Sequence, residues 1–167
     1  PFIAILSRDL GGAALSDLGV MVLASGIAAS VSASFWGRWS DVSSRRVMAA
    51  GGTLAAFAGL VAAAAAFVWS QGGAWAAYFF GAVYFVLAVA HTGVRLGRKT
   101  HLVDMAGSDK RASYVAVSNT LIGIVLLFGG AAGVLGDAAG PAAVVLLFAI
   151  LSALGAASSL RLEEVQK

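Results

Sequence analysis

The sequence contains no cysteine and few charged residues. Without cysteine, the chain can form no disulfide, no thiolate metal site and no cysteine nucleophile. Charged residues make up 11% of the chain and hydrophobic residues 60%, whereas a soluble domain has about 25% charged and roughly 45–50% apolar residues. A soluble fold could not cover so much apolar surface with polar groups, so the composition predicts an integral membrane protein surrounded by lipid.

Motifs of common catalytic and nucleotide-binding sites are also missing. The sequence has no glycine-rich phosphate loop followed by Lys and Ser or Thr, no H-E-x-x-H and no G-x-S-x-G. A membrane-embedded enzyme would depend on His91 and His101 alone, so we expect no catalytic residue, no cofactor and no metal site. The pI of about 9.7 does not predict a nucleic-acid partner, because the basic residues lie between uncharged runs of roughly twenty residues, which is a membrane-protein pattern.

Five hydrophobic stretches are each long enough to cross a bilayer. Each approaches the roughly 20 residues that span about 30 Å of hydrocarbon, and each must be helical, because an open strand would leave backbone groups unpaired in lipid. Residues 1–6 (PFIAIL) are expected to be the outer end of a further helix, which makes Ser7–Ser16 a polar loop. We therefore predict an all-α membrane bundle, a single transmembrane domain of residues 1–167 with an N-terminal stump and spans near residues 17–36, 47–69, 74–95, 112–134 and 141–160.

The basic residues lie on one side of these spans. Alternate loops belong to opposite sides of the membrane, and of the 11 Lys and Arg only Arg8 falls on the side that carries residues 70–73 and 135–140. By the positive-inside rule the other side is cytoplasmic. We expect a multi-pass protein of the cell (inner) membrane with a cytoplasmic C-terminus.

Small residues recur every four positions in the first two spans. Such stripes let helix backbones approach closely, which favours packing in lipid, and the same smooth surfaces would suit helices that slide past one another. The pattern does not separate these two roles. The residues are Gly26, Ser30 and Ser34 in the first span and Gly51, Ala55, Gly59 and Ala63 in the second.

The most informative stretch is residues 37–46, GRWSDVSSRR, which joins the first two spans. We expect a short cytoplasmic loop in which Gly37 allows a sharp turn as the helix ends. In this loop Asp41 would accept bidentate hydrogen bonds from an arginine or lie against a helix N-terminus. From the charges alone, these residues could also be positive-inside residues with a counter-ion.

The order of the residues favours a more specific interpretation. Gly37, Asp41, Arg45 and Arg46 match the pattern G-x-x-x-D-(basic)-x-G-(basic)-(basic), although the usual basic residue after Asp41 and the usual glycine before Arg45 are absent. The stretch resembles the cytoplasmic signature loop of the major facilitator superfamily (MFS), which lies between the second and third helices of each half. The resemblance implies that these four residues form a conformational latch that favours the outward-facing state.

The resemblance also implies where the chain lies in a whole transporter. A half of such a protein has six helices in two inverted triplets, so residues 1–6 become the outer end of the first helix and the five spans become the other five. The short polar tail, residues 161–167, favours a C-terminal half that lacks most of its first helix. An N-terminal half is the alternative. The N-terminal half of the transporter is then a missing partner.

A polar and basic face runs along the third span. Tyr84, His91, Arg95 and Arg98 are spaced by seven, four and three residues, so they share one helix face. Charged side chains at membrane depth face a cavity or a partner, or extend to the interface. Arg98 suits the interface, whereas Tyr84 and His91 are candidates for substrate contact. His91 is the only residue of this segment that could shuttle a proton within the membrane.

Other polar residues border the fourth span. Asp104 and Arg111 are expected in the loop before it, where they form a cytoplasmic charge cluster with Arg95 and Arg98. Asn119 lies about 12 Å from the inner end of the span, near the depth of transporter binding sites, and suits either substrate contact or an interhelical hydrogen bond. All 8 Asp and Glu fall in loops, tails or helix ends, so no buried carboxylate is expected for proton coupling.

The resemblance predicts secondary active transport of a small solute by alternating access. The substrate would be a small molecule of unknown identity, and membrane lipid would surround the helices. The alternative is a non-transporting structural or receptor-like multi-pass membrane protein built on the same helices.

Overall fold

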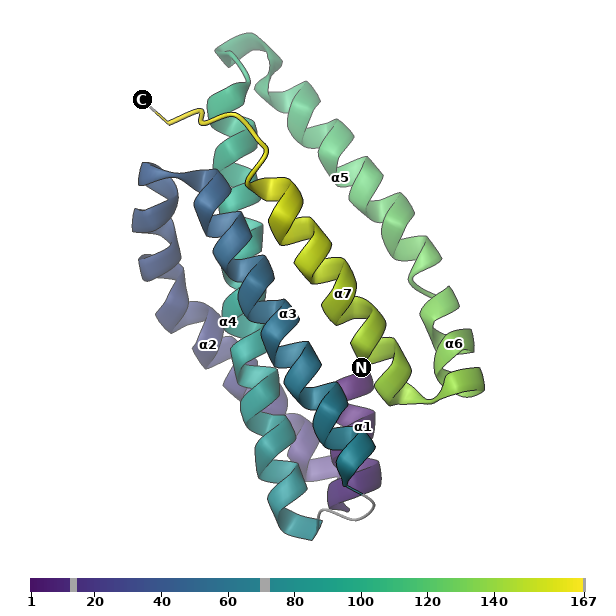
Figure 1. Ribbon diagram of the computed structural model, residues 1–167. Helices are drawn as coiled ribbons and strands as arrows, with labels where there is room; N and C mark the ends of the chain where they lie inside the picture. Colours follow the sequence, from purple (N-terminus) through teal and green to yellow (C-terminus); the bar gives the residue numbers. More distant parts are fainter. Residues whose placement is uncertain (13–14, 70–72, 167) are drawn as a thin grey trace.

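The computed structural model describes residues 1–12, 15–69 and 73–166, and these residues form helices and short connections without any strand. The all-α fold predicted from the sequence is confirmed. Figure 1 shows the elements in order, namely α1 (Phe2–Gly11), α2 (Leu15–Val42), α3 (Ser44–Val68), α4 (Gly73–Met105), a 3-10 turn η1 (Ser108–Lys110), α5 (Arg111–Phe128), α6 (Ala131–Ala139) and α7 (Pro141–Ser159).

The long helices lie side by side, and their connections alternate between two ends of the bundle. One end carries the α2–α3 and α4–α5 connections and the tail after α7. The opposite end carries the end of α3, the start of α4 and the α6–α7 connection (Figure 1). Within the described residues, four helical segments are long and apolar enough to cross a membrane, namely Ser44–Val68, Trp75–Met105, Arg111–Ala139 and Pro141–Ser159. The first predicted span, residues 17–36, lies inside the 28-residue helix α2.

The centre of the bundle is a seam of small residues along α3. A Cβ atom added to Gly51 would lie 2.9 Å from the Ala90 carbonyl oxygen on α4, and one added to Gly59 would lie 2.9 Å from Ala149 Cβ on α7. The stripe predicted in the second span therefore does bring backbones together. The stripe in the first span differs, because Gly26 meets nothing within 4 Å and lies on the exposed surface of α2.

The polar loop predicted for Ser7–Ser16 is wrong. Helix α1 continues to Gly11, because Ile3 and Leu6 are buried and Leu10 packs against the same core, a spacing that belongs to one helical face. Gly12, with φ 65, ends the helix in the left-handed region that glycine adopts without strain. Residues 13–14 lie outside the described residues, and α2 has begun by Leu15.

Two predicted boundaries at later spans are also wrong. Helix α4 continues past Arg95 to Met105, because its end packs on α3: a Cβ on Gly97 would lie 2.9 Å from the Ser44 carbonyl oxygen. The Arg111–Ala139 segment breaks at Gly129, whose N–H donates to the Leu126 oxygen in a tightened turn. Residues 131–139 are then helical as α6 rather than an outer loop from residue 135. Of the predicted outer segment 70–73, residues 70–72 lie outside the described residues.

Candidate functional site

The signature stretch is a helix junction rather than a loop. Gly37 and Asp41 lie in α2, and Arg45 and Arg46 lie in the first turn of α3, so only Ser43 separates the two helices. Ser43 has an extended backbone and its Oγ accepts a hydrogen bond from the Arg46 N–H at 3.4 Å, which caps α3. The turn predicted at Gly37 is wrong, because the cap lets α3 start directly after α2.

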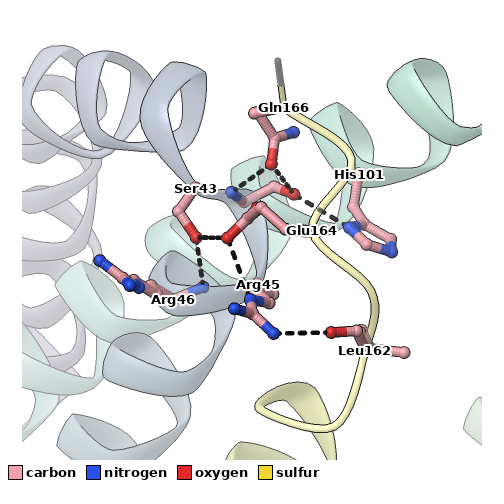
Figure 2. Close-up of polar contacts among 8 residues, drawn as sticks. Ser43, Arg45, Arg46, His101, Leu162, Glu164 and Gln166 are labelled. Atoms are coloured by element: carbon pink, nitrogen blue, oxygen red, sulfur yellow. Dashed lines mark hydrogen bonds and ion pairs between the residues drawn. The ribbon is translucent and has the colours of Figure 1, made fainter.

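The predicted pairing of Asp41 with an arginine is not formed. Within the described part of the chain, the Asp41 carboxylate is exposed and makes neither a hydrogen bond nor an ion pair. Arg45 instead points to the C-terminal tail, where its Nε donates to Glu164 Oε2 at 3.0 Å and its Nη1 donates to the Leu162 carbonyl oxygen at 3.0 Å (Figure 2). The tail therefore occupies the arginine that the motif suggested for Asp41.

Glu164 is held from two sides. The Ser43 hydroxyl donates to Glu164 Oε2 at 2.6 Å, on the same oxygen that accepts from Arg45. The hydrogen bond from Ser43 lowers the pKa of the Glu164 carboxyl below its ordinary value of 4.5, and Arg45 and Arg46 lower it further, against partial burial, which raises it. Glu164 is therefore a carboxylate at neutral pH.

Gln166 joins α3 to α4. Its Oε1 accepts hydrogen bonds from the Ser44 N–H at 3.0 Å and the Ser44 Oγ at 2.9 Å, and its Nε2 donates to Asp104 Oδ2 at 2.7 Å. Because the single hydroxyl proton of Ser44 goes to Gln166, the Ser44 Oγ accepts from His101 Nδ1, which lies 3.0 Å away. Figure 2 shows Gln166 and His101 among these polar contacts. Sequence reasoning did not single out Glu164, Gln166 or Ser43.

The predicted polar face of α4 borders cavities shared with several neighbouring helices, and Arg98 also lines one of about 520 Å³ between α4 and α5. Tyr84, His91 and Arg95 line a cavity of about 360 Å³ between α2 and α4, together with Ser25. His91 also lines a second cavity of about 450 Å³ between α3, α4 and α7, and there it is joined by Arg98. His91 therefore lies at the boundary of both.

The other predicted site residues are not gathered in one place. Arg98 Nη1 donates to Ser118 Oγ on α5 at 3.0 Å, and Arg111 Nε donates to the Ala106 carbonyl oxygen at 3.4 Å. Among the described residues, no ion pair joins these arginines or Arg95 to Asp104. Asn119 is exposed on α5 and lines none of these cavities, including the one between α4 and α5.

In the part of the chain that the structure describes, no group of three or more His, Asp or Glu side chains is placed to hold a metal ion. The polar groups at the junction are instead hydrogen-bonded to one another.

The chain has apolar helices that could span a membrane, and its connections alternate between two ends of the bundle. Together with the basic signature junction, these features define a multi-pass membrane protein of a transporter class. The family model of the Major Facilitator Superfamily matches residues 1–167, and the chain belongs to that superfamily. The resemblance inferred from the signature stretch is thereby confirmed. No curated protein and no solved structure matches the chain.

Proposed function

We propose that the chain acts as the C-terminal half of a secondary active transporter that moves a small solute by alternating access. In transporters built from inverted repeats, the substrate site lies near the bilayer midplane and the two halves rock around it. Family membership supports a transporter, and the polar face of α4 is the observation that carries the rest of the proposal.

That face places arginine side chains beside cavities at membrane depth. A charged side chain inside a bilayer is costly unless it faces water, a partner or another polar group. Arg95 lines the cavity between α2 and α4, and His91 and Tyr84 line it one and three turns away on the same helix. We assign Tyr84, His91 and Arg95 to contact with the solute.

Other faces of the chain are assigned to lipid and to the rest of the transporter. No residue of α5 is buried in this chain, and its apolar side chains Leu126, Leu127 and Phe128 are among the most exposed. We assign this helix, including Asn119, to the boundary with the N-terminal half. The remainder of the first helix would continue from α1 and cover part of the exposed surface.

The charge distribution supports an orientation in the cell (inner) membrane. The α2–α3 and α4–α5 connections and the tail after α7 lie at the same end of the bundle (Figure 1). All but one of the lysines and arginines belong to these segments or to the halves of the adjoining helices nearest to them. We assign this end to the cytoplasm by the positive-inside rule. The exposed Asp41 is then free to pair with the other half, so Gly37, Asp41, Arg45 and Arg46 keep the role of a conformational latch.

Cysteine labelling of the full-length transporter tests the cavity assignment. A cysteine at His91 should react with a membrane-impermeant maleimide at least about tenfold faster than a cysteine at Phe85, because a thiol forms its reactive thiolate in water and not in lipid. Phe85 is the matched control, since it lies on α4, is 38% exposed and lines neither cavity. A transported solute, found with a substrate panel in proteoliposomes, should slow labelling at position 91. Equal protection of both cysteines in every condition would contradict the assignment.

A further inference from the structure

The last residues of the chain cross the ends of two membrane helices. After α7 ends at Ser159, the tail runs past the α2–α3 junction to the end of α4 (Figure 2). Leu162 and Glu164 bond to α3 and its cap, whereas Gln166 bonds to both α3 and α4. The tail is the segment whose polar groups connect the cytoplasmic ends of α3, α4 and α7.

We propose that residues 162–166 form a detachable strap, which holds the end of α4 against α3 and must release before these two helix ends can separate. The proposal rests on the transporter function proposed above, because it assigns the strap to a step of the conformational cycle. It concerns contacts within this half only, whereas the latch concerns contacts between halves.

The geometry makes the strap specific. Ser43 and Ser44 are 2% and 0% exposed although they lie at a helix start on the bundle end. Their hydroxyls and the Ser44 N–H are all directed at tail side chains. A helix start has N–H groups without intrahelical partners, and here the tail supplies one of the partners.

The same geometry makes the strap releasable. The Arg45 and Glu164 side chains are 30% and 31% exposed, and ion pairs with such access to water are weak individually. Water can replace each contact when the tail leaves. On α4 the strap contacts Asp104 and, through Ser44, His101, which both belong to the last two turns of the helix. Those turns are the part of α4 that the strap restrains.

Hydrogen exchange of the full-length protein in lipid nanodiscs tests whether the strap is docked. In the double variant, Glu164→Gln removes the carboxylate charge at position 164 and Gln166→Ala removes the side-chain amide at position 166. Neither substitution lies in a membrane helix. Within residues 43–47, the Ser44 amide should exchange at least about tenfold faster in the double variant, because this N–H loses its hydrogen-bond partner. The matched control is Glu163→Gln, the neighbouring exposed glutamate, which should exchange as the wild type does. Identical exchange in the double variant and the wild type would overturn the proposal.

The second readout is the end of α4. Exchange in residues 99–106 should also rise in the double variant, and the transport rate or the ratio of outward-facing to inward-facing states should change by about two- to fivefold, the range expected for losing an exposed ion pair and its hydrogen bonds. Faster exchange at 43–47 without any change at 99–106 would show that the tail docks without restraining α4, which refutes the strap. If wild type and variants alike transport no solute, the proposed function fails, and the exchange measurements still decide whether the strap exists.

Discussion

The contact between Trp36 and Gly93 gives a sharp test of how α2 is held to α4. Trp36 is 5% exposed, and its Nε1 donates to the Val89 carbonyl oxygen at 3.0 Å. The indole lies directly over Gly93, since a Cβ at that position would be 2.8 Å from the ring atoms Cδ2 and Cε2. Gly93→Ala therefore cannot be accommodated without moving the indole.

The size of the effect follows from these distances. The ring must move by about 0.6 Å to restore an ordinary contact of 3.4 Å, and such overpacking costs about 1–3 kcal/mol. Movement also lengthens the hydrogen bond to Val89, and a hydrogen bond within a membrane protein contributes about 0.6–2 kcal/mol. Alanine gains at most about 1 kcal/mol over glycine in a helix. Gly93→Ala should therefore destabilise the protein by about 1–3 kcal/mol.

Gly81→Ala on the same helix is the matched control. A Cβ at Gly81 meets nothing within 4 Å, so this variant should be as stable as the wild type or more stable. Both free energies of unfolding can be measured by titrating SDS into mixed micelles of the full-length protein. Trp36→Leu should also remove most of the difference between the two alanine variants, because it removes the ring. Equal stability of the Gly93 and Gly81 variants would refute the packing described here.

Acidification should loosen the strap, because the pKa of Glu164 is lowered in the folded state: its stabilising contribution is present above about pH 4.5 and is lost as the pH falls through the lowered pKa. Pulsed EPR between spin labels at Arg38 and Glu163 should then show a broader distance distribution. A distribution that stays unchanged down to the acid limit at which the protein remains folded would contradict this. Asp41→Asn should alter transport rates or conformer populations with normal membrane insertion, whereas unchanged rates at normal expression would argue against the latch. Gly140→Ala should lower the thermal unfolding midpoint by the equivalent of about 1–2 kcal/mol, because Gly140 has φ 83, and Gly133→Ala in α6, which meets nothing within 4 Å, should not.

The helical fold could be predicted because lipid leaves few alternatives. A run of about twenty apolar residues must pair its own backbone groups, so length and hydropathy alone indicate a helix. Helix ends were less predictable, since they depend on packing with distant segments. Helix α4 extends beyond Arg95 because Gly97 lies against Ser44 on α3, and nothing in the local sequence of α4 indicates that neighbour.

For the candidate site, too, the features set by local helix geometry could be predicted, and the contacts between distant segments could not. The spacing of Tyr84, His91 and Arg95 fixes a common helix face, and these residues do line one cavity. The tail contacts were not predicted, because they join residues that lie far apart in the sequence. One signal was present: Glu164 and Gln166 are two residues apart, and such residues lie on the same side of an extended segment.

Helix α5 is packed much less tightly than α3, α4 and α7. Along most of their length, helices α3, α4 and α7 pack closely at glycines that leave no room for a Cβ atom, so we expect these parts to move together. Helix α5 buries none of its residues and is joined to α4 by the hydrogen bond from Arg98 to Ser118. A displacement of α5 would therefore be transmitted to α4, and through it to α3 and α7, mainly by the Arg98 side chain.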